Sequence, residues 1–191
     1  MRTLTTTSTR VRGAILLAGA LVLIPILSAT AFPVQGGQAN LSAIREATAK
    51  YHDVQAAIAD GYAPFYVCTD KEGTGAMGQH FVKGALVDPV NSPGIDPLTP
   101  EALVYEPMPD GSLRLVATEY VTFQDAYHGA FGANATPSVV GWPLIAVGAN
   151  NRYGLPPFFE RHVWLWSPNP LGMFDDWNSR VSCRGNGDPA I

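Results

Sequence analysis

Apolar residues recur every three or four positions between residues 40 and 60, which is the spacing of an amphipathic helix. The apolar stripe is formed by Leu41, Ile44, Ala47, Tyr51, Val54 and Ile58. Asn40 or Ser42 can cap the beginning of the helix, and Gly61 follows as a typical stop. The pattern therefore predicts one helix over residues 40–60.

Beyond residue 61 the pattern changes to short runs rich in β-branched and aromatic residues, which are typical of strands. The predicted strands cover residues 62–68, 75–82, 102–106, 113–123 and 158–166. Pro109-Asp110-Gly111 stands between the third and fourth runs and predicts a hairpin. Together these elements predict an α+β fold, in which an N-terminal amphipathic helix is followed by an antiparallel β-sheet that could be barrel-like.

Two of the predicted strands carry ionisable residues on an otherwise apolar or aromatic face. Strand side chains alternate, so the fourth run places Glu119 in the middle of one apolar face. That face consists of Leu113, Leu115, Ala117, Glu119, Val121 and Phe123. In the last run, the same alternation puts Glu160 and His162 beside Trp164 and Trp166. A buried carboxylate is costly, so Glu119 must find a cation, a metal ion, a hydrogen-bond donor or a proton.

Residues 1–31 have the three parts of a secretory signal peptide. A basic start with three arginines is followed by an uncharged apolar stretch and by Ala29-Thr30-Ala31, which suits a cleavage site. The apolar stretch is shorter than the ~20 residues that a membrane-spanning helix needs. The sequence therefore predicts that residues 32–191 form one secreted α+β domain, extracellular or periplasmic, with no membrane span after cleavage. A retained N-terminal anchor is the alternative.

Charge and cysteine content narrow the range of partners. Removal of residues 1–31 takes away three arginines and no acidic residue, so the net charge changes from −4 to −7. An acidic domain is a poor match for nucleic acid, because phosphate binding needs a basic surface. Cys68 and Cys183 are the two cysteines, and in an exported domain they predict a disulfide bond. A free catalytic thiol is the alternative.

The sequence predicts a metal site formed by His80, Glu119 and His162. Each of these residues lies in a different predicted strand, and a curved sheet could bring all three together inside it. Two imidazoles with one carboxylate suit a divalent transition metal such as Fe, Cu, Mn or Zn. Glu106 and Glu160 are candidates for an additional ligand.

Two other interpretations of these residues stay open. In the first, Glu119 pairs with Arg114 or Arg161 and the histidines make hydrogen bonds in the core, so that the cluster has a purely structural role. In the second, one of the histidines is an axial haem ligand with Met77 or Met173 opposite, although the C-x-x-C-H attachment motif is absent.

Motifs of several other enzyme classes are missing or stand in the wrong context. The sequence contains no G-x-S-x-G nucleophile elbow. Gly73, Gly75 and Gly78 match the dinucleotide-binding pattern by letter, but they neither follow a βα unit nor open a helix. Asp175-Asp176-Trp177-Asn178 lacks the spacing of an EF-hand and predicts a capped turn with Trp177 packed inward.

Several long motifs resemble a family of small secreted bacterial hypothetical proteins. These motifs are TAKYHDV, GAMGQH, PEALVYEP, HVWLW and NPLGMFDDWN. The resemblance implies export and implies no mechanism. It points to His52, His80, Glu106, Glu119, His162 and Trp164. A glycine-rich entry to a histidine strand is also cupin-like, although the paired His-x-His of cupins is missing.

Two functions from different classes follow from these patterns. The first is a secreted metal-binding protein, or a metal-dependent oxidoreductase, whose His/Glu site lies inside the sheet. The second is a non-catalytic secreted binding module that holds a small apolar or sugar-like molecule. Its pocket would be formed by Trp164 and Trp166 with residues 127–157, a segment rich in Gly, Pro and Asn that is typical of a functional loop.

Overall fold

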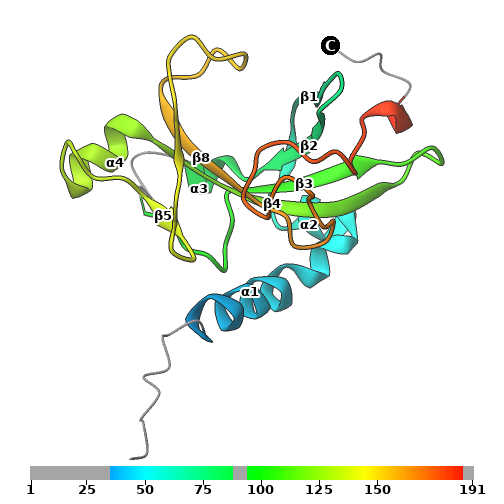
Figure 1. Ribbon diagram of the computed structural model, residues 1–191, viewed down its shortest axis with the longest axis horizontal. Helices are drawn as coiled ribbons and strands as arrows, with labels where there is room; N and C mark the ends of the chain where they lie inside the picture. Colours follow the sequence, from blue (N-terminus) through cyan, green and yellow to red (C-terminus); the bar gives the residue numbers. More distant parts are fainter. Residues whose placement is uncertain (1–34, 88–93, 187–191) are drawn as a thin grey trace, which may run out of the picture. The chain divides into compact units, whose positions relative to one another are not determined.

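A computed structural model describes residues 35–87 and 94–186 of the chain (Figure 1). The described residues belong to one compact unit, Pro33–Ile191. The predicted signal peptide, residues 1–31, lies outside the described residues. No described helix is both long enough and apolar enough to cross a membrane.

The region expected to form one helix over residues 40–60 contains three helical pieces. They are α1 (Gln35–Thr48), the 3-10 helix η1 (Ala49–His52) and α2 (Val54–Ala59). Asp53 interrupts them because its backbone is extended and its side chain accepts a hydrogen bond from the backbone N–H of Gln55 at 2.9 Å. The residue therefore acts as the N-cap of α2. The remaining helices are α3 (Gly84–Val87), α4 (Gln124–Phe131) and η2 (Arg184–Asn186).

Six strands form one antiparallel sheet in the order β1-β2-β3-β4-β8-β7. Their bounds are β1 Ala63–Lys71, β2 Gly75–Val82, β3 Ala102–Pro107, β4 Leu113–Phe123, β7 Ile145–Val147 and β8 Phe158–Val163. A separate pair is formed by β5 (Ser138–Val139) and β6 (Trp142–Pro143). The six-stranded sheet is curled into a half-barrel with β1 and β7 at its two edges (Figure 1). The predicted α+β class is confirmed.

The predicted hairpin is confirmed, and it contains a bulge that the alternation did not reveal. Val104 pairs with Ala117 and Tyr105 pairs with Leu115, so Val116 is an extra residue in β4. Val116 and Ala117 therefore pack in the same cluster, whereas Leu115 packs on the other side of the sheet. The prediction that Leu115 shares the face of Glu119 is wrong for this reason.

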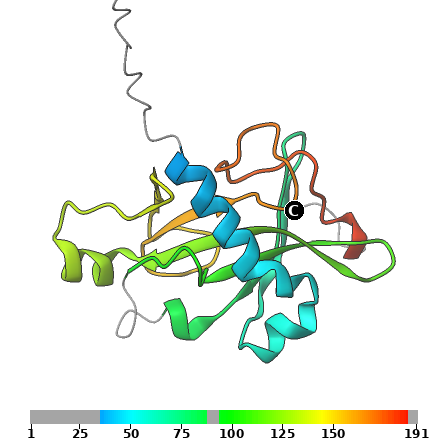
Figure 2. The same cartoon turned by 90° about the horizontal axis from the view of Figure 1, so that it is seen from below.

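Helices α1 and α2 cover one face of the sheet (Figure 2). Ile44 of α1 packs in one hydrophobic cluster with Tyr120 of β4, and Ala57 of α2 packs in another with Leu103 of β3. The opposite face carries Val104, Ala117 and the side chains of the predicted metal site.

The segment that follows β8 lies against this opposite face. Strand β8 ends at Val163, earlier than predicted, because the next backbone N–H, that of Trp164, donates to the carbonyl of Met173 at 2.9 Å. Further along, Ala76 and Asn178 exchange two backbone hydrogen bonds of 3.1 and 3.0 Å. Gly75 permits this approach, since a Cβ there would lie 2.2 Å from the carbonyl oxygen of Asn178.

The predicted disulfide bond is confirmed. Cys68 of β1 is bonded to Cys183, with 5.6 Å between the two Cα atoms, and both residues are buried. The bond ties the segment after β8 to the edge strand across a sequence separation of 115 residues.

We expect the double variant Cys68→Ser/Cys183→Ser to unfold more easily than the wild type. In the chain-entropy model, opening a loop of this length lowers the free energy of unfolding by about 4–5 kcal/mol. Urea unfolding measures the difference. A reducing agent should destabilise the wild type to the same extent and leave the double variant unchanged. Equal unfolding free energies of the two proteins would contradict a stabilising role for the bond.

Candidate metal centre

His80, Glu119 and His162 project from the same face of β2, β4 and β8. Glu119 stands directly opposite His162, whereas His80 stands opposite Val104 of the intervening strand β3. Strands that flank a third strand are about 10 Å apart. The β3 residue opposite Glu119 is Ala102, whose side chain is small, so in this curled sheet the long side chains of His80 and Glu119 can meet above it.

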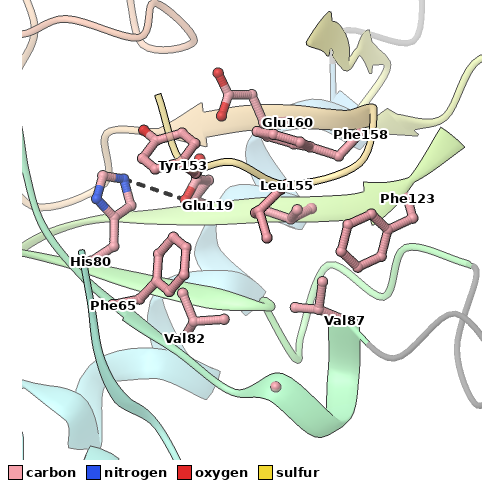
Figure 3. A pocket seen from close by; sticks show the side chains of 12 residues that line it. Phe65, His80, Val82, Val87, Glu119, Phe123, Tyr153, Leu155, Phe158 and Glu160 are labelled. Carbon is pink, nitrogen blue, oxygen red and sulfur yellow. Dashed lines mark ion pairs between the residues drawn. The ribbon is translucent and has the colours of Figure 1, made fainter. Parts of the chain in front are cut away.

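The donor atoms of these three residues converge, and Figure 3 shows the contact between His80 and Glu119. One donor atom from each residue can be chosen so that all lie within 4.8 Å of one another. The two Nε2 atoms of His80 and His162 are 3.2 Å apart, and Nε2 of His80 lies 3.4 Å from a carboxylate oxygen of Glu119. A metal–nitrogen distance of about 2.1 Å places the ligand atoms of a tetrahedral site about 3.4 Å apart. This buried group could therefore hold a metal ion.

Burial keeps both imidazoles in the neutral form that binds metals. Removal from water lowers the pKa of His80 to about 4. Burial, together with the neighbouring His80 and Arg161, holds the pKa of His162 well below its ordinary value. Each neutral ring therefore has a lone pair on one nitrogen at neutral pH, and the two Nε2 atoms lie within hydrogen-bond distance of each other.

Burial raises the pKa values of the carboxyl groups of the site, whereas it lowers those of the histidines. Burial and the nearby carboxyl of Glu160 raise the pKa of Glu119 well above its ordinary value. The pKa of Glu160 is raised to about 7 by burial and by the negative charge of Asp176. Without a cation among them, these carboxyl groups tend to keep a proton, and a bound metal ion would supply the missing positive charge.

His162 lies between the ring of Trp164 and the carboxyl group of Asp176. Its ring is fully buried and stacks on Trp164, with 5.6 Å between the ring centroids and an angle of 13°. Its Nδ1 atom lies 3.9 Å from Oδ1 of Asp176. Within the described part of the chain, both atoms are buried and neither has a hydrogen-bond partner.

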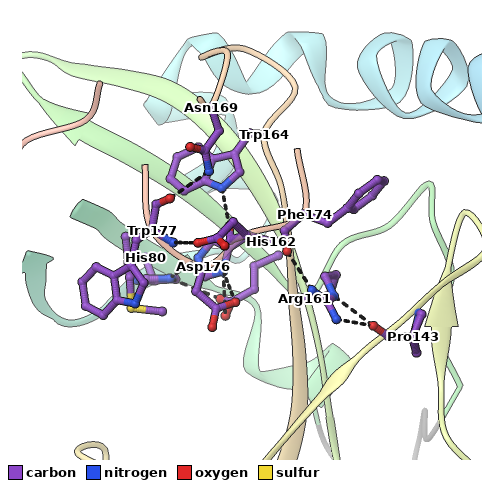
Figure 4. Close-up of polar contacts among 12 residues, drawn as sticks. His80, Pro143, Arg161, His162, Trp164, Asn169, Phe174, Asp176 and Trp177 are labelled. Atoms are coloured by element: carbon purple, nitrogen blue, oxygen red, sulfur yellow. Dashed lines mark hydrogen bonds and ion pairs between the residues drawn. The ribbon is translucent and has the colours of Figure 1, made fainter. Parts of the chain in front are cut away.

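Asp176 was predicted to lie in a turn and was not assigned to the site. The expected capped turn exists, because Asp175 accepts a hydrogen bond from the backbone N–H of Trp177 at 3.0 Å. That turn directs Asp176 toward His162 (Figure 4). The adjacent Asp175 and Asp176 were a sign of a polar site in the sequence. Only the tertiary structure, in which this segment packs back against the sheet, shows that Asp176 is a neighbour of His162.

Glu106 is not part of the site, which corrects one predicted additional ligand. It forms an ion pair with Arg114 and accepts a hydrogen bond from the backbone N–H of Ser182 at 3.1 Å. Arg161 donates to the backbone carbonyls of Pro143 and Phe174. The purely structural interpretation paired Glu119 with Arg114 or Arg161, and neither arginine is its partner. Glu160, the other candidate, lies next to Glu119.

The predicted tryptophan pocket is wrong because the strand that would align the two rings ends at Val163. Trp164 packs behind His162, and its indole N–H donates to the carbonyl of Asp175. Trp166 contacts the exposed His52, with ring centroids 4.4 Å apart. Neither tryptophan lines the cavity next to the site. The haem alternative, with Met77 or Met173 opposite one of the histidines, stays a prediction.

A different set of side chains forms a cavity of about 310 Å³ beside the site (Figure 3). Its ionisable residues are His80, Glu119, Tyr153 and Glu160. The other residues that line it are Phe65, Val82, Gly84, Val87, Val121, Phe123, Leu155 and Phe158. Sequence analysis named neither Phe65 nor Tyr153, because their position depends on the curl of the sheet and on the path of a loop.

Part of the predicted functional loop does contribute to this cavity. Tyr153 and Leu155 belong to residues 127–157 and line the cavity. Asn151 shapes the loop: its amide nitrogen donates to the carbonyls of Gly148 and Leu155, and its amide oxygen accepts from the backbone N–H groups of Tyr153 and Leu155. The loop therefore has a defined conformation where it meets the site.

Comparisons of the chain with protein-family models, with curated proteins and with solved structures gave no match. The resemblance to small secreted bacterial proteins therefore stays a prediction. The function has to be inferred from the geometry of the site itself.

Glu101 is a further buried carboxyl group, and it allows a test of whether burial raises carboxyl pKa values in this protein. It accepts a hydrogen bond from the backbone N–H of Val121 at 3.1 Å, and burial raises its pKa to about 8. Between pH 4.5 and 8 the folded protein keeps this proton while the unfolded chain releases it. The free energy of unfolding should therefore fall as pH rises through this window, by up to about 1.4 kcal/mol per pH unit for this group.

We expect Glu101→Gln to remove this contribution and to flatten the decrease in stability between pH 5 and pH 8. Urea unfolding of the chelator-treated protein at several pH values measures it. Glu72→Gln, at an exposed position, is the matched control and should follow the wild type. Parallel curves for Glu101→Gln and the wild type would contradict the raised pKa.

Proposed function

We propose that this protein binds one divalent transition-metal ion through His80, Glu119 and His162. The observation that carries the proposal is the convergence of their donor atoms, all within 4.8 Å, at a buried position reached from three strands. Such a cluster is costly to bury without a cation, because the site then contains a carboxyl group with a strongly raised pKa.

The types of ligand restrict the choice of metal. Two imidazole nitrogens and one carboxylate oxygen suit Fe(II), Mn(II), Cu(II) or Zn(II), and they leave at least one coordination position for another ligand. The identity of the ion decides between redox and Lewis-acid chemistry, so a metal-dependent oxidoreductase is one form that the proposed function could take.

Asp176 fits the role of an outer partner of the centre. Metal-bound histidines usually donate their second N–H to a carboxylate or carbonyl, which orients the ring. When Nε2 of His162 and the carboxylate of Glu119 bind the ion, Nδ1 of His162 lies 3.9 Å from Oδ1 of Asp176, the same distance as from an oxygen of Glu119. Nδ1 of His162 and Oδ1 of Asp176 are two of the four buried side-chain atoms that lack a hydrogen-bond partner within the described residues. A small shift of either side chain would form the hydrogen bond.

The proposal also includes export, on the basis of residues 1–31 and the disulfide bond. The bond between Cys68 and Cys183 supports an oxidising compartment, where such bonds persist. An exported metal-binding protein therefore agrees with the cysteine chemistry of the chain.

We expect protein purified from an oxidising compartment without chelator to contain about one transition-metal ion per chain by elemental analysis. His80→Ala, His162→Ala and Glu119→Gln should each lose the ion, since each removes one of the three proposed ligands. His128→Ala is the matched control, because its ring contacts Phe159 away from the site and its loss should leave the metal content unchanged.

Circular dichroism establishes whether each variant is folded, so that loss of metal is not confused with loss of the fold. A folded wild-type protein that contains no metal and is not stabilised by added Fe, Cu, Mn or Zn would contradict the proposal. Retention of the ion in both histidine variants would contradict the assignment of the ligands.

We expect Asp176→Asn to weaken metal affinity by about 10–100-fold, the usual effect of losing such an outer carboxylate. The stoichiometry at saturating metal should remain one ion per chain, because Asp176 is not itself a ligand. A competition titration against a chelator measures the affinity. Asp175→Asn, which alters the adjacent turn residue, should change affinity far less, and equal effects of the two variants would contradict a specific role for Asp176.

A further inference from the structure

The cavity beside the proposed metal centre has one polar end and an otherwise apolar lining (Figure 3). His80 and Glu119 line the polar end, where their side chains approach to 3.4 Å. The volume of about 310 Å³ is at the lower limit of pockets that hold small molecules. A ligand in this cavity would therefore be small and would have one end next to the metal-binding side chains.

The charges of the lining exclude anionic ligands. Among the described residues that line the cavity, none is a lysine or an arginine, whereas Glu119 and Glu160 contribute two carboxyl groups. Two ionised carboxyl groups balance the two charges of the proposed ion, so a carboxylate, phosphate or sulfate group would add uncompensated negative charge, with no cationic side chain of the cavity to offset it. A sugar is excluded for a related reason, because most of its hydroxyl groups would face apolar walls.

The polar end favours a hydroxyl group on the ligand. A hydroxyl oxygen can donate a lone pair to the open position of the metal ion, and its proton can be donated to a carboxyl oxygen such as that of Glu160, which lines the same cavity. A pure hydrocarbon can do neither. The aromatic side chains of Phe65, Phe123, Tyr153 and Phe158 favour an aromatic ring in the body of the ligand.

We propose that this cavity binds a small uncharged phenol whose hydroxyl oxygen coordinates the metal ion at His80, Glu119 and His162. The inference rests on the proposed metal centre and specifies the class of molecule that the centre receives. The ring of the phenol occupies the apolar part of the cavity, between the strands and the loop that carries Leu155.

The test uses the wild-type protein loaded with Co(II), whose visible absorption reports the coordination of the ion, and 4-ethylphenol as the probe. We expect 4-ethylphenol to change the Co(II) spectrum and to bind at least about tenfold more tightly than ethylbenzene or 4-ethylbenzoate, which is a free-energy difference of about 1.4 kcal/mol. Ethylbenzene lacks the hydroxyl, and 4-ethylbenzoate carries a negative charge in its place.

Two variants fill the cavity from different sides without altering a metal ligand. Leu155→Trp enlarges a side chain of the loop, and Val82→Phe enlarges one of β2. Each should weaken 4-ethylphenol binding at least about tenfold and leave Co(II) affinity unchanged. Leu98→Trp, at a side chain that is 47% exposed and outside the cavity, is the control and should bind as the wild type does.

The outcomes separate this inference from the proposed function. If the wild type binds no Co(II), both are overturned. If Co(II) binds but 4-ethylphenol leaves its spectrum unchanged, or if 4-ethylbenzoate binds more tightly, the phenol site is overturned and the metal centre stands. Equal binding of 4-ethylphenol to the metal-free and Co(II)-loaded proteins overturns the contact between hydroxyl and metal.

Discussion

The burial of the Glu119 carboxyl group is the constraint on which the site depends. A carboxylate removed from water needs a cation, strong hydrogen bonds or a proton. The two arginines that the sequence offered as partners of Glu119 make other contacts: Arg114 pairs with Glu106, and Arg161 donates to backbone carbonyls. Glu119 faces the neutral imidazoles of His80 and His162. Neutral imidazoles are weak partners for a carboxylate but good ligands for a metal, so the proposed cation would satisfy all three side chains at once.

The rest of the fold places this group on the face of the sheet opposite α1 and α2. That face is left for the segment after β8 and for the cavity. The disulfide bond at Cys183 and the contact of Asn178 with Ala76 hold that segment against the first two strands. Asp176 lies between the end of β8 and these attachments, which explains why its carboxyl group reaches His162.

Local patterns predicted the elements, and tertiary contacts decided the details. Runs rich in β-branched and aromatic residues identified the strands of His80, Glu119 and His162, which bury residues on both faces. Alternation then assigned faces within the strands of Glu119 and His162. It failed at Val116, since a bulge reverses the faces without any mark in the apolar pattern. It also failed for Trp164 and Trp166, because a backbone hydrogen bond to Met173 ends the strand before them. Asp176 and Tyr153 could not be assigned to the site, since their neighbours are distant in the sequence.

The same apolar surroundings have opposite consequences for the empty and the occupied site. Without a cation, low local polarity raises the pKa of Glu119 and makes its negative form costly. With a divalent ion present, low polarity strengthens the attraction between the ion and the carboxylate. The apolar side chains also line the adjoining cavity, where ionised Glu119 and Glu160 would balance the charge of the proposed divalent ion. A ligand entering from that side would then meet little net charge and apolar walls, which favours an uncharged oxygen donor over an anion.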